Sequence, residues 1–148
     1  MTRSAFRMSH PLRVRWAEVD PQGIVFNANY LLYFDVAVTE YWREIGCLYP
    51  NAFNEHGVDT FVVKATLEYH RPARFDDPLD VLVRVARIGR SSLRTLIEVQ
   101  RGEEHLVSGE LIYVVASVAA RESTPVPDFL RNAIVQYELT PPEQQTRG

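Results

Sequence analysis

One long apolar helix is the sequence feature that most limits what this chain can fold into. Residues 29–45 carry apolar side chains at steps of three and four, the spacing of one helix face: Tyr30, Phe34, Ala37, Tyr41 and Ile45. More apolar residues flank this face, so the helix is predicted to be enclosed by other elements. Asn27 or Asn29 is expected to cap its start, and Gly46 to stop it.

Strand-like segments precede and follow this helix. Residues 12–18 alternate between apolar and polar, and further strands are predicted at residues 61–69, 79–88, 93–99 and about 105–119. The short connections between the later segments indicate antiparallel pairing. Residues 105–119 are apolar on both faces, which is typical of a central or interface strand. An antiparallel sheet must cover one apolar face, so the pattern predicts an α+β fold with the sheet wrapped around the 29–45 helix.

The chain is predicted to form one domain over its 148 residues, because no linker or repeat divides it. Its core is expected at about residues 11–138. The ends are expected to be mobile: an arm of about nine residues, and a polar tail after a last helix at 127–137.

Composition narrows the function classes. The formal net charge of −3 gives no reason to expect nucleic-acid binding, although 15 of the 16 basic residues are Arg, a residue suited to phosphate recognition. Cys47 is the only cysteine, so no intrachain disulfide forms and a cytoplasmic location is expected. No apolar run approaches the length of a membrane span.

Residues 18–35 carry most of the information about function. Asp20 precedes a Pro-x-Gly turn that ends at Gly23, and the long helix follows shortly after. A carboxylate next to a helix N-terminus lies beside N–H groups that bind negative charge, a pairing that suits acyl chemistry. The alternatives are an Asp20 that only starts a turn and an Asn27 that only caps the helix.

Other chemistry-bearing residues are predicted to have ordinary roles. The four histidines show neither metal-ligand nor catalytic spacing, and His70 falls on the polar face of its strand. No serine lies in a G-x-S-x-G motif, so a serine hydrolase is not predicted. Asp35 is expected to be a solvated helix residue and Cys47 a packing residue.

The sequence resembles the 4-hydroxybenzoyl-CoA thioesterase family of hot-dog-fold acyl-CoA thioesterases. The resemblance is carried by D-P-x-G-I-V-F-x-x-x-Y at residues 20–30, by residues 69–79 and by residues 87–92, and it covers roughly residues 11–120. It implies a hot-dog fold and a homodimer or homotetramer with active sites between subunits. It also implies hydrolysis of an acyl-CoA to a carboxylic acid and CoA, without metal or organic cofactor.

The resemblance also assigns residues to roles. It implies that Asp20 is the catalytic acid and that the backbone N–H of Asn27, a position where relatives often have His or an aromatic, polarises the thioester carbonyl. Its phosphate-contacting basic position falls on Arg90, while a second basic position found in some relatives is Gly89 here. The remaining substrate-binding residues expected are Gly23, Ile24, Val25, Tyr30, Ser91 and Ser92.

The leading hypothesis is therefore an acyl-CoA thioesterase. Asp20 would attack the carbonyl or activate water, and the sequence leaves both routes open. One alternative is a hot-dog hydratase or dehydratase, which usually pairs His with an acid; the absence of His from residues 11–55 argues against it. The other is a non-catalytic acyl-CoA or acyl-carrier binding protein.

Overall fold

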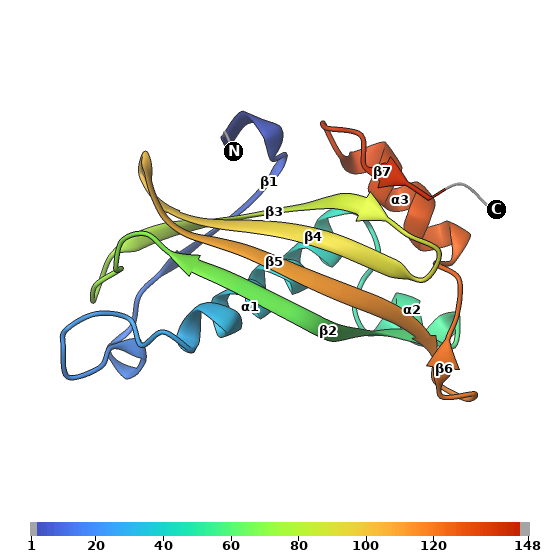
Figure 1. Ribbon diagram of the computed structural model, residues 1–148, viewed down its shortest axis with the longest axis horizontal. Coiled ribbons are helices and arrows are strands. Elements are labelled where there is room, and N and C mark those ends of the chain that lie inside the picture. Colours follow the sequence, from blue (N-terminus) through green and yellow to red (C-terminus); the bar gives the residue numbers. More distant parts are fainter. Residues whose placement is uncertain (1–2, 146–148) are drawn as a thin grey trace.

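A curled antiparallel sheet wraps around one long helix in the computed structural model, which describes residues 3–145 (Figure 1). The helices are α1 (Asn29–Glu44), α2 (Asn51–Glu55) and α3 (Asp128–Tyr137), with short 3-10 turns at Arg3–Ala5 and Trp16–Glu18. The strands are β1 (Met8–Arg13), β2 (Val58–Tyr69), β3 (Pro78–Ile88), β4 (Ser92–Arg101), β5 (Glu104–Ser117), β6 (Glu122–Ser123) and β7 (Glu143–Gln144).

The main strands lie in the order β1-β3-β4-β5-β2, and each neighbouring pair is antiparallel. β5 pairs with β4 on one side and β2 on the other, so the prediction of a central strand there is confirmed. β2 forms one edge of the sheet, and its outer edge pairs with no described strand. The predicted α+β arrangement, a sheet around one helix, is confirmed.

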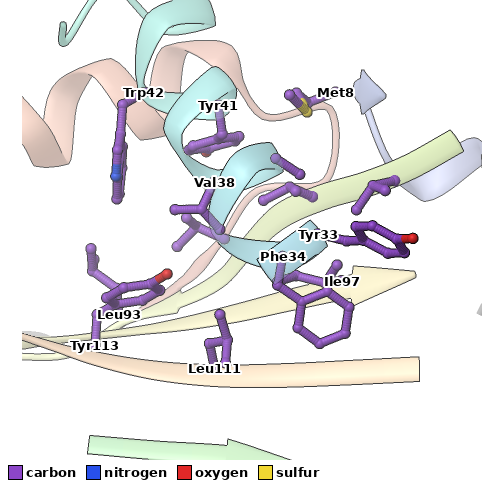
Figure 2. Packing of buried hydrophobic residues seen from close by; sticks show 14 of the residues in the cluster. Met8, Tyr33, Phe34, Val38, Tyr41, Trp42, Leu93, Ile97, Leu111 and Tyr113 are labelled. Atoms are coloured by element: carbon purple, nitrogen blue, oxygen red, sulfur yellow. The ribbon is translucent and has the colours of Figure 1, made fainter. Parts of the chain in front are cut away.

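The predicted apolar face of α1 forms the centre of the core. Phe34, Ala37 and Tyr41 are fully buried. Figure 2 shows Phe34 and Val38 pointing from the helix toward the sheet, where Leu111 lies. Burying one such side chain contributes roughly 1.5–3 kcal/mol, so this face fixes the helix on the sheet.

The prediction that other elements enclose the 29–45 helix is wrong for the face of α1 that points away from the sheet. Leu31, Leu32 and Val36 are exposed, because no described strand or helix covers that side of α1. The predicted N-caps Asn27 and Asn29 are wrong, because Ala28 stands at the N-cap position without a side-chain hydrogen bond. The predicted stop is confirmed, since Gly46 follows the last helical turn with a φ of 84°.

Gly109 lies on β5 directly beneath Phe34. A Cβ atom at this glycine would stand 2.4 Å from Cε2 of the Phe34 ring, which is a steric clash. The helix therefore approaches the sheet at a point where the strand has no side chain.

The N-terminal segment differs from the prediction. The strand ends at Arg13 instead of continuing to residue 18, and Trp16 lies in a 3-10 turn with its ring stacked on Phe75 at 3.7 Å. The prediction of a mobile arm is wrong for residues 3–9, because the Phe6 and Met8 side chains are buried. Residues 1, 2 and 146–148, the outermost part of the ends predicted to be mobile, lie outside the described residues.

Candidate active site

The Asp20 loop is a closed turn between the 3-10 segment Trp16–Glu18 and α1. The Asp20 N–H donates to the Ile24 carbonyl at 2.9 Å, and the Gly23 N–H donates to the Asp20 carbonyl at 2.9 Å. Gly23 has a φ of 80°, a conformation that favours glycine. The predicted Pro-x-Gly turn is therefore present and holds Asp20 in a defined place.

The Asp20 carboxylate is held by one of its two oxygens. Oδ1 accepts a hydrogen bond from the Gln22 N–H at 2.8 Å. Oδ2 has no hydrogen-bond partner among residues 3–145, and the residue is half-buried. One carboxylate oxygen is thus left available to a ligand.

The start of α1 presents N–H groups to the same region. The Asn29 N–H donates to the Phe26 carbonyl at 2.9 Å, whereas the Asn27 N–H has no acceptor within the described chain. Because the first N–H groups of a helix lack partners inside it, they carry partial positive charge that attracts anions. Asn27 lies two residues before α1 begins, so it offers an unused donor next to the positive end of the helix.

A pocket of about 300 Å³ brings these groups together. Its lining residues are Asp20, Gln22, Ile24, Val25, Asn27, Tyr30, Tyr69, His70, Arg71 and Pro72. Five of the residues singled out from the sequence share this pocket: Asp20, Ile24, Val25, Asn27 and Tyr30. Gly23 does not line it but closes the turn that carries Asp20.

Two tyrosines fix the pocket wall. The Tyr69 hydroxyl donates to the Asn27 carbonyl at 3.2 Å, and the Tyr30 hydroxyl accepts from the Ala73 N–H at 3.1 Å. Their rings meet edge to face with centroids 5.7 Å apart. Burial raises the pKa of Tyr30, which keeps its hydroxyl neutral at neutral pH.

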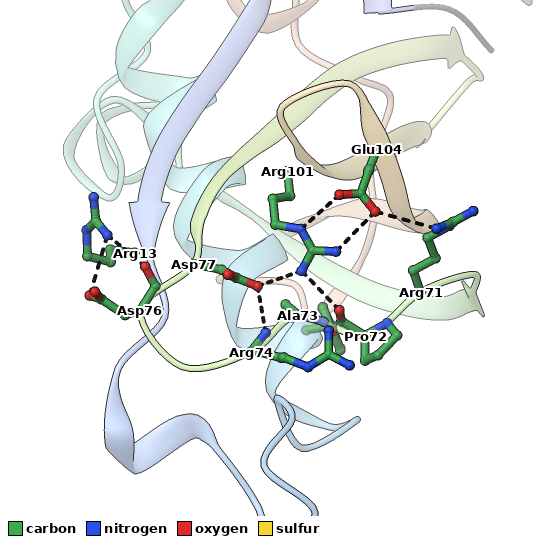
Figure 3. Close-up of polar contacts among 10 residues, drawn as sticks. Arg13, Arg71, Pro72, Ala73, Arg74, Asp76, Asp77, Arg101 and Glu104 are labelled. Carbon is green, nitrogen blue, oxygen red and sulfur yellow. Dashed lines mark hydrogen bonds and ion pairs between the residues drawn. The ribbon is translucent and has the colours of Figure 1, made fainter.

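The segment after β2 is held against the pocket by a charged network, shown in Figure 3. Arg101 donates to Asp77 at 2.6 Å and to the Pro72 carbonyl at 3.3 Å. Arg101 also bonds Glu104, which pairs with Arg71 at 3.6 Å. Hydrogen bonds to Glu104 and Asp77 raise the pKa of Arg101, so this guanidinium stays charged while it holds the wall.

The residues of the pocket wall after β2 were not assigned to the site from the sequence. His70, predicted to have an ordinary surface or interface role, is exposed; it also lines the same pocket as Asp20, and its Nε2 lies 2.9 Å from Ser108 Oγ. The signal available was that residues 69–72 end a strand within a segment resembling the family. Pairing β2 with β5 is needed to see that this end lies beside the Asp20 loop.

Arg90, Ser91 and Ser92 do not line the pocket. Arg90 and Ser91 lie in the connection between β3 and β4, and Ser92 begins β4; the Val115 N–H of β5 donates to the Ser91 carbonyl at 2.8 Å. In the strand register this turn lies level with the start of β2, with β5 between them, whereas the pocket lies at the end of β2, at Tyr69. Ser92 is level with Phe61, and the eight steps from Phe61 to Tyr69 span roughly 26 Å of strand.

Two general findings bear on the site. No helix within residues 3–145 is long and apolar enough to cross a membrane. No group of three or more His, Cys, Asp or Glu side chains in this part of the chain is arranged to hold a metal ion.

Comparison with known proteins gives consistent matches. The chain matches the Thioesterase-like superfamily over residues 14–134. The acyl-CoA thioester hydrolase YbgC of Escherichia coli O157:H7 is 30% identical over 115 residues, which cover 78% of this chain and 84% of that protein. A putative esterase of Aquifex aeolicus (strain VF5) is 33% identical over 78 residues, 53% of this chain and 60% of that protein.

Solved structures agree in fold. A thioesterase from Thermus thermophilus, complexed with coenzyme A and Zn, is 29% identical with a TM-score of 0.78, covering 90% of this chain and 96% of that chain. The AQ1494 protein of Aquifex aeolicus, 22% identical, has a TM-score of 0.80 over 86% of this chain and 98% of that chain. From its fold, its pocket and these matches, the chain belongs to the Thioesterase-like superfamily and is a hot-dog-fold thioester hydrolase.

Proposed function

We propose that this protein is an acyl-CoA thioesterase in which Asp20 and the Asn27 N–H act on the same thioester carbonyl. One observation carries the proposal: a single pocket holds a carboxylate oxygen without a partner and a main-chain N–H without an acceptor among residues 3–145. Acyl-CoA thioester hydrolysis is also the activity for which the YbgC relatives are named.

The two groups divide the chemistry between them. The thioester oxygen accepts a hydrogen bond from the Asn27 N–H, which stabilises the charge that develops on that oxygen. Such a donor is typically worth about 10²–10³ in rate, or about 3–4 kcal/mol. The Asp20 oxygen either attacks the carbonyl carbon and expels the CoA thiolate, leaving an anhydride that water hydrolyses, or takes a proton from an attacking water.

We further propose that two copies pair through β2. Its exposed side chains include Phe61, Val62, Val63 and Tyr69, each at least half exposed. A free sheet edge with apolar side chains is a site for pairing with another strand. A two-fold axis makes such a pairing antiparallel, so the start of one β2 lies beside the end of the other.

This pairing accounts for the separation of Arg90 from Asp20. Because Arg90 lies at the end of the sheet where β2 starts and the pocket lies where β2 ends, the antiparallel dimer brings Arg90 of the second copy toward the pocket end. Arg90 is exposed, and its guanidinium has no partner among the described residues. We propose that it binds the CoA phosphates, aided by the hydroxyls of Ser91 and Ser92.

One observation favours a second candidate, an acyl-CoA hydratase. His70 and Asp20 line one pocket, which supplies the His–acid pair that this chemistry uses. Against it, the His70 Nε2 is engaged by Ser108. Hydration of an enoyl-CoA, measured as a loss of the absorbance of its conjugated double bond, would support the hydratase. Release of free thiol from an acyl-CoA would support the thioesterase.

The decisive experiment is the substitution Asp20→Asn, assayed by free-thiol release from short, long and aromatic acyl-CoAs. We expect kcat to fall by at least about 10²-fold with the melting temperature preserved, since the amide has no charge with which to attack or activate water. Glu55→Gln, which removes an exposed carboxylate on α2, is the matched control. Near wild-type thiol release by soluble Asp20→Asn would refute the mechanism, and no release by the wild type would favour a binding protein.

A further inference from the structure

We infer that Glu18 is a positioning residue that, through its contact with Tyr33, fixes the Asp20 carboxylate relative to the Asn27 N–H. This inference rests on the proposed function, because it assigns a task within the same site. Glu18 does not line the pocket, so it acts through the residues that it holds.

The main chain of Glu18 ties together both ends of the Asp20 loop. Its carbonyl accepts hydrogen bonds from the Phe26 N–H and from the Asn29 side-chain amide, both at 2.9 Å. Asn27 lies between these two donors, and Asp20 follows Glu18 by two residues. One carbonyl thus contacts the chain on both sides of the proposed oxyanion donor.

The side chain of Glu18 connects the loop to the body of α1. Glu18 is 8% exposed, and its Oε1 accepts from the Tyr33 hydroxyl at 2.9 Å and from the Arg15 N–H at 2.8 Å. Its Oε2 accepts from the Arg15 guanidinium at 2.8 Å. Burial raises the pKa of Glu18, but the hydrogen bonds from Arg15 and Tyr33 outweigh burial and lower it, so the carboxylate stays ionised at neutral pH.

This arrangement matters because the reaction depends on the distance between the Asp20 carboxylate and the Asn27 N–H. The thioester carbon must lie between the Asp20 oxygen and the Asn27 donor, and a misplacement of about 1 Å can reduce rate about 10²-fold. Tyr33 lies one turn into α1, which is fixed on the sheet by Phe34. The Glu18–Tyr33 bond therefore connects the loop to the part of α1 that is packed on the sheet.

The chain supplies a matched control for this contact. Tyr41 donates to Glu138 at 2.6 Å, which is a second buried tyrosine–glutamate bond on the same helix. It lies eight residues, or about 12 Å, farther along α1 and away from the pocket. Tyr33→Phe and Tyr41→Phe remove the same hydroxyl from the same kind of pair.

The test compares these two variants for thiol release and for amide hydrogen exchange. We expect Tyr33→Phe to lower kcat about 10-fold or more with KM within about two-fold, because a displaced loop loses transition-state contacts but not substrate binding. We expect Tyr41→Phe to keep kcat even where its melting temperature falls as much. Amides of residues 19–27 should exchange faster in Tyr33→Phe than in Tyr41→Phe.

Glu18→Gln and Glu18→Ala extend the test should Tyr33→Phe fold poorly. Gln keeps an acceptor for Tyr33, so kcat of Glu18→Gln should lie closer to the wild type than kcat of Glu18→Ala. Equal losses of kcat in Tyr33→Phe and Tyr41→Phe, or unchanged loop exchange, overturn the positioning role. An inactive Asp20→Asn with a fully active Tyr33→Phe overturns this inference alone and leaves the proposed function standing.

Discussion

Asn27 illustrates how a residue acts in the proposed site without its side chain. The group assigned to the carbonyl oxygen is a main-chain N–H, which every residue except proline supplies. Where the resemblance implies His or an aromatic at this position, Asn removes any role of a His side chain but keeps the proposed donor. Residue identity at position 27 carries little information about the chemistry, whereas its place at the start of α1 carries much.

At the same scale, Arg90→Ala tests the phosphate contact. We expect KM for acyl-CoA to rise about 3- to 10-fold with a smaller effect on kcat, because the contact acts alike on ground state and transition state. An acyl-pantetheine thioester without the CoA phosphates should not respond. Arg94→Ala, which removes an arginine that pairs with Glu110 at 2.8 Å, is the control. Equal impairment with both substrates would make Arg90 a structural residue.

Helices and strands with a clear hydrophobic periodicity were predicted well, whereas segments whose conformation depends on a single tertiary contact were not. The α1 boundaries follow from its apolar spacing and were predicted to within a residue. The first strand was placed too late because Trp16 continues its alternation. Trp16 instead leaves the sheet and stacks on Phe75, a partner 59 positions away whose proximity no local pattern reveals.

The packing of α3 against α1 has a pH dependence of its own. Glu138 is 8% exposed, its Oε2 accepts from Tyr41 and from the Val85 N–H, and its Oε1 has no partner among residues 3–145. Burial raises the pKa of Glu138 above its ordinary 4.5. Its contribution to stability is therefore full below pH 4.5 and is lost as pH rises through the folded-state pKa.

Glu138→Gln removes that titration. We expect the melting temperature of this variant relative to the wild type to rise with increasing pH above about 4.5, because only the wild type must ionise a buried carboxyl. Glu18→Gln serves as the opposite case. The pKa of Glu18 is lowered from 4.5, so the melting temperature of the wild type should rise relative to that of Glu18→Gln as pH rises toward 4.5. A pH-independent difference for Glu138→Gln would contradict the assignment.

For the whole molecule, the sequence predicts a homodimer or homotetramer, and the pairing proposed for it uses β2. Residues 105–119 form β5, a central strand with a neighbour on each side, so this strand has no free edge for pairing with a second copy. The edge strand β2 carries several exposed apolar side chains, although its sequence pattern looks like that of an ordinary half-buried strand. Which strand is an edge depends on sheet order, and sheet order is set by long-range pairing that no single segment encodes.

The proposed dimer is tested by placing a charge on the free edge. Val63→Lys, at a position 61% exposed on β2, should shift the molecular mass measured by light scattering from twice 17.0 kDa to 17.0 kDa. We expect KM for acyl-CoA to rise in parallel, because Arg90 of the second copy is withdrawn. Leu139→Lys, 60% exposed beyond α3, controls for the loss of an exposed apolar side chain. A wild type that is monomeric at micromolar concentration would refute the pairing.

Gly109 has a consequence that reaches the pocket. The Phe34 ring rests where this residue has no Cβ, so the height of α1 above the sheet is set at that point. Tyr30 lies one turn earlier on α1, and Asn27 lies just before α1 begins. Any side chain at position 109 would act as a wedge beneath the helix and tilt its first turn, changing the depth of the pocket from a place no ligand touches.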